Sequence, residues 1–138
     1  MTHLKVLLVS FALLTLMSCN TSKTNQSAVP KAGMFKVEIL YPNGEGKTFD
    51  MDYYEKNHMP MMAGLLGKNL NFYEIDKGIS GRTPSDKAPF VAIGYFYIND
   101  VAAYGKVIGE NITAILKDIE KYTNIQPTIQ ISEIRQLR

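Results

Sequence analysis

One short segment of the chain is rich in side chains that can do chemistry. Residues 49–62 read Phe-Asp-Met-Asp-Tyr-Tyr-Glu-Lys-Asn-His-Met-Pro-Met-Met, so two tyrosines lie within five residues of His58. The chain has one other histidine, His3, which lies in a segment that we predict to be an export signal. Imidazole gains and loses a proton near neutral pH. Any such chemistry in the mature protein would therefore use His58.

The spacing of Tyr54 and His58 predicts that they act together. Residues four apart on a helix share one face, so the two side chains can touch. Adjacent helical residues point about 100° apart, so Tyr53 and Tyr54 cannot both face one cavity. We therefore take His58 as the candidate proton-transfer residue and Tyr54 as the candidate that orients a substrate.

Pro60 offers another explanation for this histidine. Its ring removes one backbone N–H and clashes with the carbonyl four residues back, that of Lys56. A polar side chain near such a disturbance can pair with the freed carbonyl, in which case His58 would be structural. Core packing is likewise an alternative role for both tyrosines.

Three more residues are candidates for lining a substrate cavity. Glu38 shares the less apolar face of a predicted strand with Lys36, and a buried carboxylate there would be a candidate base. An ordinary ion pair, solvated or between subunits, is the competing interpretation. Met61 belongs to a methionine-rich run that we interpret as adaptable packing at a cavity entrance. Tyr95 lies on the second face of a strongly apolar strand.

The sequence contains no recognisable metal or cofactor motif. The methionine run is accompanied by one histidine and no free cysteine, which is not a metal-ligand set. The segment 43–47, Asn-Gly-Glu-Gly-Lys, is too short for a phosphate-binding loop. Neither a zinc ligand pattern nor a dinucleotide fingerprint occurs. We expect the protein to work without a metal or cofactor.

Segments with a two-residue hydrophobic period and segments with a 3.6-residue period follow one another along the chain, and they predict the order β-α-β-β-α-β. Strand patterns occupy residues 35–41, 70–79, 90–98 and 128–137, and a loop with two prolines fills residues 80–89. Two helices follow candidate N-caps, Asp50 for the first and Asn99 or Asp100 for the second. This is the α+β, ferredoxin-like arrangement, with a four-stranded antiparallel sheet and two helices on one face.

The strand 90–98 is apolar on both faces, although two helices cover only one. Phe90, Phe96 and Ile98 lie on one side, and the other carries Val91, Ile93, Tyr95 and Tyr97. Such a strand is normally buried on both faces. We therefore expect a homodimer that pairs the two uncovered faces and encloses a cavity between the sheets.

The first 18 residues predict a lipoprotein signal peptide. Lys5 precedes the apolar run 6–16, which is too short for a comfortable membrane span. Leu16-Met17-Ser18-Cys19 resembles the bacterial lipobox, in which the cysteine is lipidated and becomes the first residue. An ordinary cleaved signal is the alternative. We expect attachment to the membrane by the lipid on Cys19 alone.

The remaining chain divides into a tether and one domain. Residues 19–33 comprise the lipidated cysteine and a polar, flexible tether, and residues 34–138 have the length of one domain. Asn20, which follows the lipobox, resembles the outer-membrane sorting pattern of some bacteria. Loss of the signal removes one of the 15 basic residues and none of the 13 acidic ones. The nearly neutral body argues against nucleic acid as a partner.

Three separated motifs of the body resemble the EthD family of dimeric α+β barrel proteins. They are Tyr41-Pro42, then Phe49-Asp50-x-x-Tyr53-Tyr54-x-x-x-His58-Met59-Pro60, and finally Asp118-Ile119-x-x-Tyr122-Thr123-Asn124-x-x-Pro127-x-x-Gln130. The resemblance covers residues 35–134 and implies a ferredoxin-like protomer and a dimer built across the sheets. It also implies that His58 lies at the mouth or wall of the barrel cavity. The chain departs from typical members in carrying a lipoprotein signal.

The residues and the resemblance together favour a small-molecule enzyme. We expect an apolar or aromatic, oxygenated compound in the dimer barrel, with His58 transferring a proton. Isomerisation, cyclisation and cofactor-free oxygenation would all suit such a site, and members of the family are often labelled reductases. The alternative is a non-catalytic lipoprotein that binds a small hydrophobic ligand or a protein partner.

Overall fold

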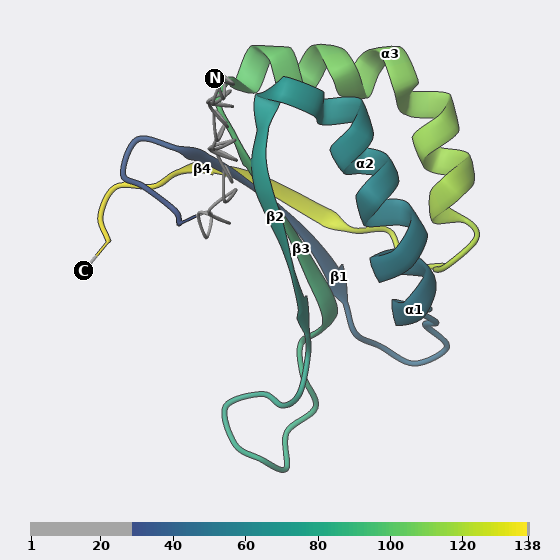
Figure 1. Ribbon diagram of the computed structural model, residues 1–138. Helices are drawn as coiled ribbons and strands as arrows, with labels where there is room; N and C mark the ends of the chain where they lie inside the picture. Colours follow the sequence, from purple (N-terminus) through teal and green to yellow (C-terminus); the bar gives the residue numbers. More distant parts are fainter. Residues whose placement is uncertain (1–28, 138) are drawn as a thin grey trace, which may run out of the picture.

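Four strands form one antiparallel sheet, as the alternating patterns predicted (Figure 1). The computed structural model describes residues 29–137. The strands are β1 (Phe35–Pro42), β2 (Leu70–Lys77), β3 (Phe90–Ile98) and β4 (Thr128–Glu133). Their order is β2-β3-β1-β4, and each neighbouring pair is antiparallel. The α+β, ferredoxin-like prediction is confirmed, although β2 and β4 end earlier than expected.

Two helical segments join the strands, and both begin at the predicted caps. The first comprises α1 (Met51–Tyr53), the π-helical turn η1 (Tyr54–His58), α2 (Met59–Leu66) and the short 3₁₀ turn η2 (Gly67–Asn69). The second is α3 (Val101–Ile119). Asp50 accepts a hydrogen bond from the Tyr53 backbone N–H at 3.0 Å, and Asp100 accepts one from Ala103 at 2.6 Å. These bonds satisfy donors that a helix start leaves free.

The π-helical turn changes which residues of the first helical segment are buried. The Met59 N–H bonds to the carbonyl of Tyr54, five residues back, just before Pro60 enters the first turn of α2. The wider turn contains an additional residue, so the side chains that follow are rotated relative to a regular helix. The buried face therefore continues through Met62 and Leu66. Met61 and Leu65, which the expected helical stripe would direct inward, are only partly buried against the core.

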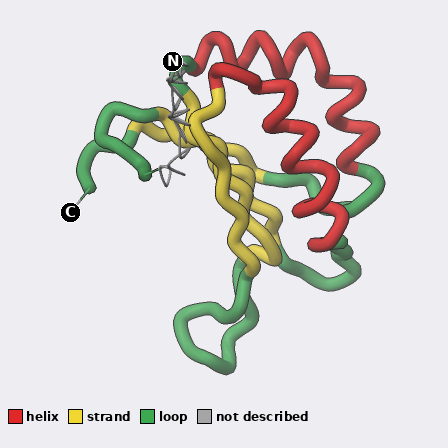
Figure 2. Tube along the Cα trace, viewed as in Figure 1, coloured by secondary structure: helices red, strands yellow, loops and turns green. Residues whose placement is uncertain are grey.

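Both helical segments pack on the same face of the sheet, and α2 lies beside α3 (Figures 1 and 2). The core between the layers is built by alternate residues of the two central strands, whose side chains point toward the helices. These buried residues are Val37, Ile39, Tyr41, Ala92, Phe96 and Ile98. The opposite face carries the other alternate residues, and no element of residues 29–137 covers it.

The predicted signal peptide and lipobox, with Cys19, lie outside the described residues. Within residues 29–137, no helix has both the length and the hydrophobicity that crossing a membrane requires.

Candidate functional site

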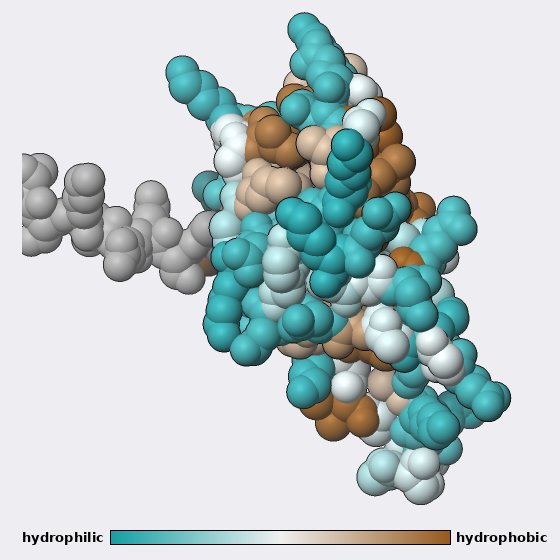
Figure 3. Space-filling model, turned by 90° about the vertical axis from the view of Figure 1, so that its right-hand side faces the viewer, coloured by the Kyte–Doolittle hydropathy of each residue, from teal (hydrophilic) through white to brown (hydrophobic). Residues whose placement is uncertain are grey.

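A cavity of about 240 Å³ lies between the sheet and the helices of the protomer. Its wall is mainly apolar, and α3 contributes more lining residues than any other element. The complete lining is Ile39, Tyr41, Tyr54, His58, Met62, Phe96, Tyr104, Ile108, Ile112, Ile115, Leu116, Ile119, Gln126, Pro127 and Ile129. Ile112, Leu116 and Ile129 are about half exposed, at 43%, 54% and 56%, so the cavity opens between α3 and β4. Hydrophobic side chains also reach the surface among hydrophilic ones in the side view of Figure 3.

His58 forms a buried pair with a carboxylate that the sequence analysis did not select. Its Nδ1 lies 2.8 Å from Oδ2 of Asp118, near the C-terminal end of α3, and the imidazole is only 5% exposed. The ring stacks on Tyr54, with centroids 5.6 Å apart and planes 16° apart. The predicted contact between Tyr54 and His58 is therefore present.

Asp118 receives hydrogen bonds on both of its carboxylate oxygens. The Tyr53 hydroxyl donates to Oδ1 at 2.8 Å, and the Lys121 ammonium donates to the same oxygen at 3.1 Å. Burial alone would raise the pKa of Asp118, but the bonds from His58, Tyr53 and Lys121 outweigh it and hold that pKa below its usual value. Asp118 is therefore ionised at neutral pH.

The pKa of His58 is lowered from its usual value of 6.5. Burial disfavours the charged imidazolium and is the larger effect, while the bond to Asp118 acts in the opposite direction. The imidazole is consequently neutral at pH 7. A neutral imidazole can accept a proton from a ligand.

Tyr54 is enclosed among aromatic rings and the backbone of β3. It is 1% exposed, and its hydroxyl lies so close to Gly94 that a side chain there would overlap it. Burial, followed by the proximity of Tyr41, raises the pKa of Tyr54 well above 10. The neighbouring hydroxyls of Tyr41 and Tyr122 are 2.7 Å apart. Tyr54 lines the cavity and Tyr53 does not, as their spacing on the helix predicted.

Within the protomer, the three predicted cavity residues do not lie beside the two predicted catalytic residues. Glu38 and Tyr95 are register partners on the uncovered face of the sheet, on the far side from His58. Glu38 pairs with Lys36 at 2.7 Å and accepts a hydrogen bond from Gln130 at 3.1 Å. Burial, followed by the neighbouring Asp76, raises the pKa of Tyr95 to about 12. These two residues belong to a separate polar network.

Met61 does not line the cavity that contains His58, whereas its neighbour Met62 does. The π-helical turn is the reason, because it rotates α2 relative to the regular helix that the sequence analysis assumed. Of the predicted site residues, His58 and Tyr54 line the cavity of the protomer, and Glu38, Met61 and Tyr95 do not.

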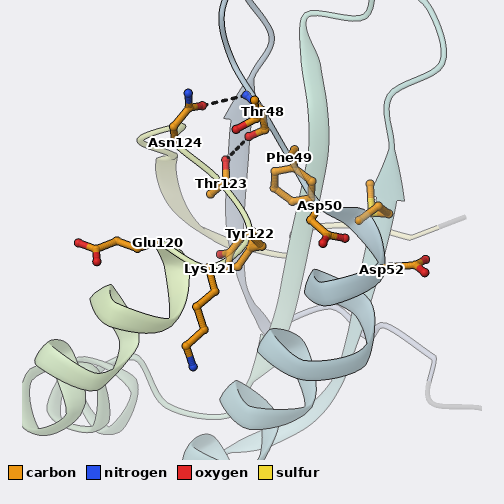
Figure 4. A pocket seen from close by; sticks show the side chains of 10 residues that line it. Thr48, Phe49, Asp50, Asp52, Glu120, Lys121, Tyr122, Thr123 and Asn124 are labelled. Atoms are coloured by element: carbon orange, nitrogen blue, oxygen red, sulfur yellow. Dashed lines mark hydrogen bonds between the residues drawn. The ribbon is translucent and has the colours of Figure 1, made fainter.

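A second, more open depression lies where the loop before α1 meets the segment after α3 (Figure 4). Two hydrogen bonds join its walls: Thr48 N–H donates to Asn124 at 2.8 Å, and the Thr123 hydroxyl donates to the Thr48 carbonyl at 2.7 Å. Together they fix Tyr122, whose ring centroid lies 4.8 Å from that of His58. These two bonds thus help to hold Tyr122 beside His58.

Asp118 and Tyr122 are the functional candidates that sequence reasoning missed. Both belong to the third motif, but no role could be assigned to them from spacing alone. One signal was available: Asp118 is an acid between the apolar residues Ile115 and Ile119, on the face of α3 that packs inward. A buried acid on such a face normally has a partner.

Comparisons with known proteins identify the family. No family model and no curated protein matches the chain. The crystal structure of an EthD-like protein from Ralstonia eutropha JMP134 matches with a TM-score of 0.73 and 36% identity, over 78% of this chain and 97% of that one. The chain belongs to the EthD-like family. An ethyl tert-butyl ether D (EthD) family protein from Bacillus halodurans C-125 shares the fold at 20% identity and a TM-score of 0.55, over 72% of this chain and 97% of that one.

In the cavity wall of this EthD-like protein, the imidazole of His58 is the group that gains and loses a proton near neutral pH. His58 supplies a neutral imidazole to this mainly apolar cavity, whereas the Tyr54 ring lines the wall and its hydroxyl lies against Gly94. Within residues 29–137 no three His, Cys, Asp or Glu side chains are grouped so that they could hold a metal ion.

Proposed function

We propose that this EthD-like protein is a small-molecule enzyme in which His58 transfers a proton to or from an apolar or aromatic, oxygenated compound. The substrate would occupy the cavity between the helices and the sheet. Isomerisation, cyclisation and oxygenation without a cofactor all contain such a proton-transfer step.

One observation carries this proposal: a neutral imidazole, held by an ionised carboxylate, forms part of the wall of a mainly apolar cavity. A buried histidine with only a structural role has no need of a cavity beside it. Perturbed titratable groups in apolar pockets are also typical of active sites. The pairing of His58 with Asp118 further argues against the alternative in which His58 pairs with a backbone carbonyl freed by Pro60.

The proposal is tested by exchange of hydrogen for deuterium in small carbonyl compounds. A panel of aryl ketones and unsaturated lactones would be incubated in D₂O, and loss of the acidic C–H signal followed by NMR. We expect the wild-type protein to accelerate exchange for at least one compound, and His58→Asn to lower that rate about 100-fold or more. Equal rates for both proteins would assign the chemistry elsewhere. No acceleration with measurable binding would favour the non-catalytic ligand-binding alternative.

We also propose a homodimer that pairs the uncovered faces of two sheets. Ile93, Tyr95 and Phe72 lie on this face, and Phe72 stacks on Tyr97 with ring centroids 4.1 Å apart. An apolar and aromatic surface of this kind favours association with a second copy. In such a dimer the network of Glu38 and Tyr95 would lie between the sheets.

Anchoring by a lipid on Cys19 remains a proposal that rests on the sequence alone. The lipobox-like Leu16-Met17-Ser18-Cys19 supports export and attachment to a bacterial membrane, with Asn20 favouring the outer membrane. The polar tether would leave the domain free to meet small molecules outside the cytoplasm.

A further inference from the structure

Three hydrogen-bond donors converge on the carboxylate of Asp118. His58 approaches Oδ2, while the Tyr53 hydroxyl and the Lys121 ammonium approach Oδ1. An ionised carboxylate can only accept hydrogen bonds, so the Nδ1 of His58 must carry a hydrogen. A neutral imidazole has one N–H. The other ring nitrogen, Nε2, is therefore left with a lone pair.

The Nε2 atom is open to the cavity. Among residues 29–137, no group forms a hydrogen bond with it, yet every fully buried polar side-chain atom described there has a partner. His58 itself is one of the residues lining the cavity. The structure thus presents an acceptor to a space whose walls are mainly apolar.

We propose that Asp118 is a positioning residue that holds His58 in the Nδ1–H form, and that the cavity consequently selects ligands with a hydroxyl donor on an apolar body, such as phenols and enols. A hydroxyl can donate to Nε2, whereas an ether oxygen of the same shape can only accept. An unpaired acceptor that loses contact with water lowers affinity. An ether would leave Nε2 without a donor, so the cavity should bind the ether more weakly than the hydroxyl compound.

The same arrangement defines the direction of proton transfer. The ligand O–H bond breaks as a bond between Nε2 and that hydrogen forms, which leaves an oxyanion beside an imidazolium. The negative charge of Asp118 stabilises the imidazolium through Nδ1–H. No oxidant or co-reactant is needed. This inference rests on the proposed site but does not depend on turnover.

The first test is the ¹⁵N NMR spectrum of the imidazole in the full-length chain carrying His3→Gln, which leaves His58 as the only histidine. Two-bond correlations to the ring protons distinguish Nδ1 from Nε2, and their shifts show which nitrogen bears hydrogen. We expect the Nδ1–H form at pH 7.5. A spectrum dominated by the Nε2–H form would overturn the proposal, even if the protein proved to be an active enzyme.

The second test compares the binding of p-cresol, which has a hydroxyl group, with that of 4-methylanisole, its methyl ether. We expect p-cresol to bind at least about tenfold more tightly by calorimetry. Asp118→Asn should shift the imidazole toward the Nε2–H form and remove the preference. Glu120→Gln makes the same chemical change at an exposed position nearby and should alter neither. Equal binding of the two ligands to the wild-type protein would refute the selection of donors.

The outcomes separate this inference from the proposed function. Loss of deuterium exchange with an intact Nδ1–H form and a p-cresol preference would leave a binding site without catalysis. Should Asp118→Asn fail to fold, the wild-type spectrum and the wild-type ligand pair still decide the proposal.

Discussion

Burial and hydrogen bonding shift the pKa of His58 in opposite directions. Burial is the larger effect, so the pKa in the folded state lies below the unfolded value of about 6.5. Above that pH both states are neutral at this site. Below it the unfolded chain binds the proton first, and the folded state loses stability as pH falls through its own, lower pKa.

We therefore predict that the free energy of unfolding decreases between pH 7.5 and pH 5. His58→Asn keeps a donor near the position of Nδ1 but does not titrate, so its unfolding free energy should depend less on pH over this range. Urea denaturation at several pH values measures both. Working above pH 5 limits the contribution of Asp118, whose lowered pKa affects stability at more acidic pH. Parallel pH profiles for the two proteins would contradict the lowered pKa of His58.

The residues of the site were only partly predictable from the sequence. Tyr54 and His58 are close in sequence, and helical spacing was enough to pair them. Asp118 lies 60 residues beyond His58 and on another helix. Its partnership depends on how α3 packs beside α2, which no local pattern specifies.

At the scale of the elements, strand β3 restricts the position of the Tyr54 side chain. Gly94 leaves room for the Tyr54 hydroxyl at the point where the helix crosses the strand, and a methyl group there would overlap it. We predict that Gly94→Ala lowers the free energy of unfolding by about 1–3 kcal/mol, because Tyr54 or the strand must move. It should also weaken ligand binding in the cavity.

Gly105→Ala is the matched control for this substitution. Gly105 is exposed on α3 and has open space around it. Alanine there should stabilise the helix by about 0.5–1 kcal/mol. Urea denaturation of both variants measures the two effects, and destabilisation of similar size in both would show that the contact with Tyr54 is unimportant.

The π-helical turn explains the part of the helix that sequence reasoning misplaced. The periodicity of residues 51–65 predicted a regular helix, and the position of Pro60 indicated a disturbance without giving its form. The turn closed by the Met59–Tyr54 bond includes one more residue than an α-helical turn. The inward position consequently moves from Met61 to Met62, an outcome that depends on tertiary packing.

For the whole molecule, the sheet separates two chemically different surfaces. The helical face encloses the apolar cavity with His58, whereas the uncovered face carries the network of Glu38 and Tyr95. The element order and the two-faced character of β3 could be predicted from period-two patterns. Which face holds the cavity could not, because the expected dimer offered an equally reasonable space between the sheets.

We predict that the protein is a dimer in sedimentation equilibrium and that Ile93→Lys weakens it at least tenfold. Ile93 lies on the uncovered face, where a lysine would be forced into the proposed interface. Ile79→Lys places the same charge in the loop after β2, at a residue already 84% exposed, and should leave association unchanged. A wild-type protein that stays monomeric at all concentrations would remove the dimer proposal without affecting the cavity.

The most direct test of the account is a crystal structure of the protein with p-cresol. We predict that the ring lies between the helices and the sheet, near Ile108 and Phe96, with its hydroxyl within hydrogen-bond distance of the Nε2 of His58. A ligand found instead between two sheets, against Glu38 and Tyr95, with nothing bound beside His58, would contradict it.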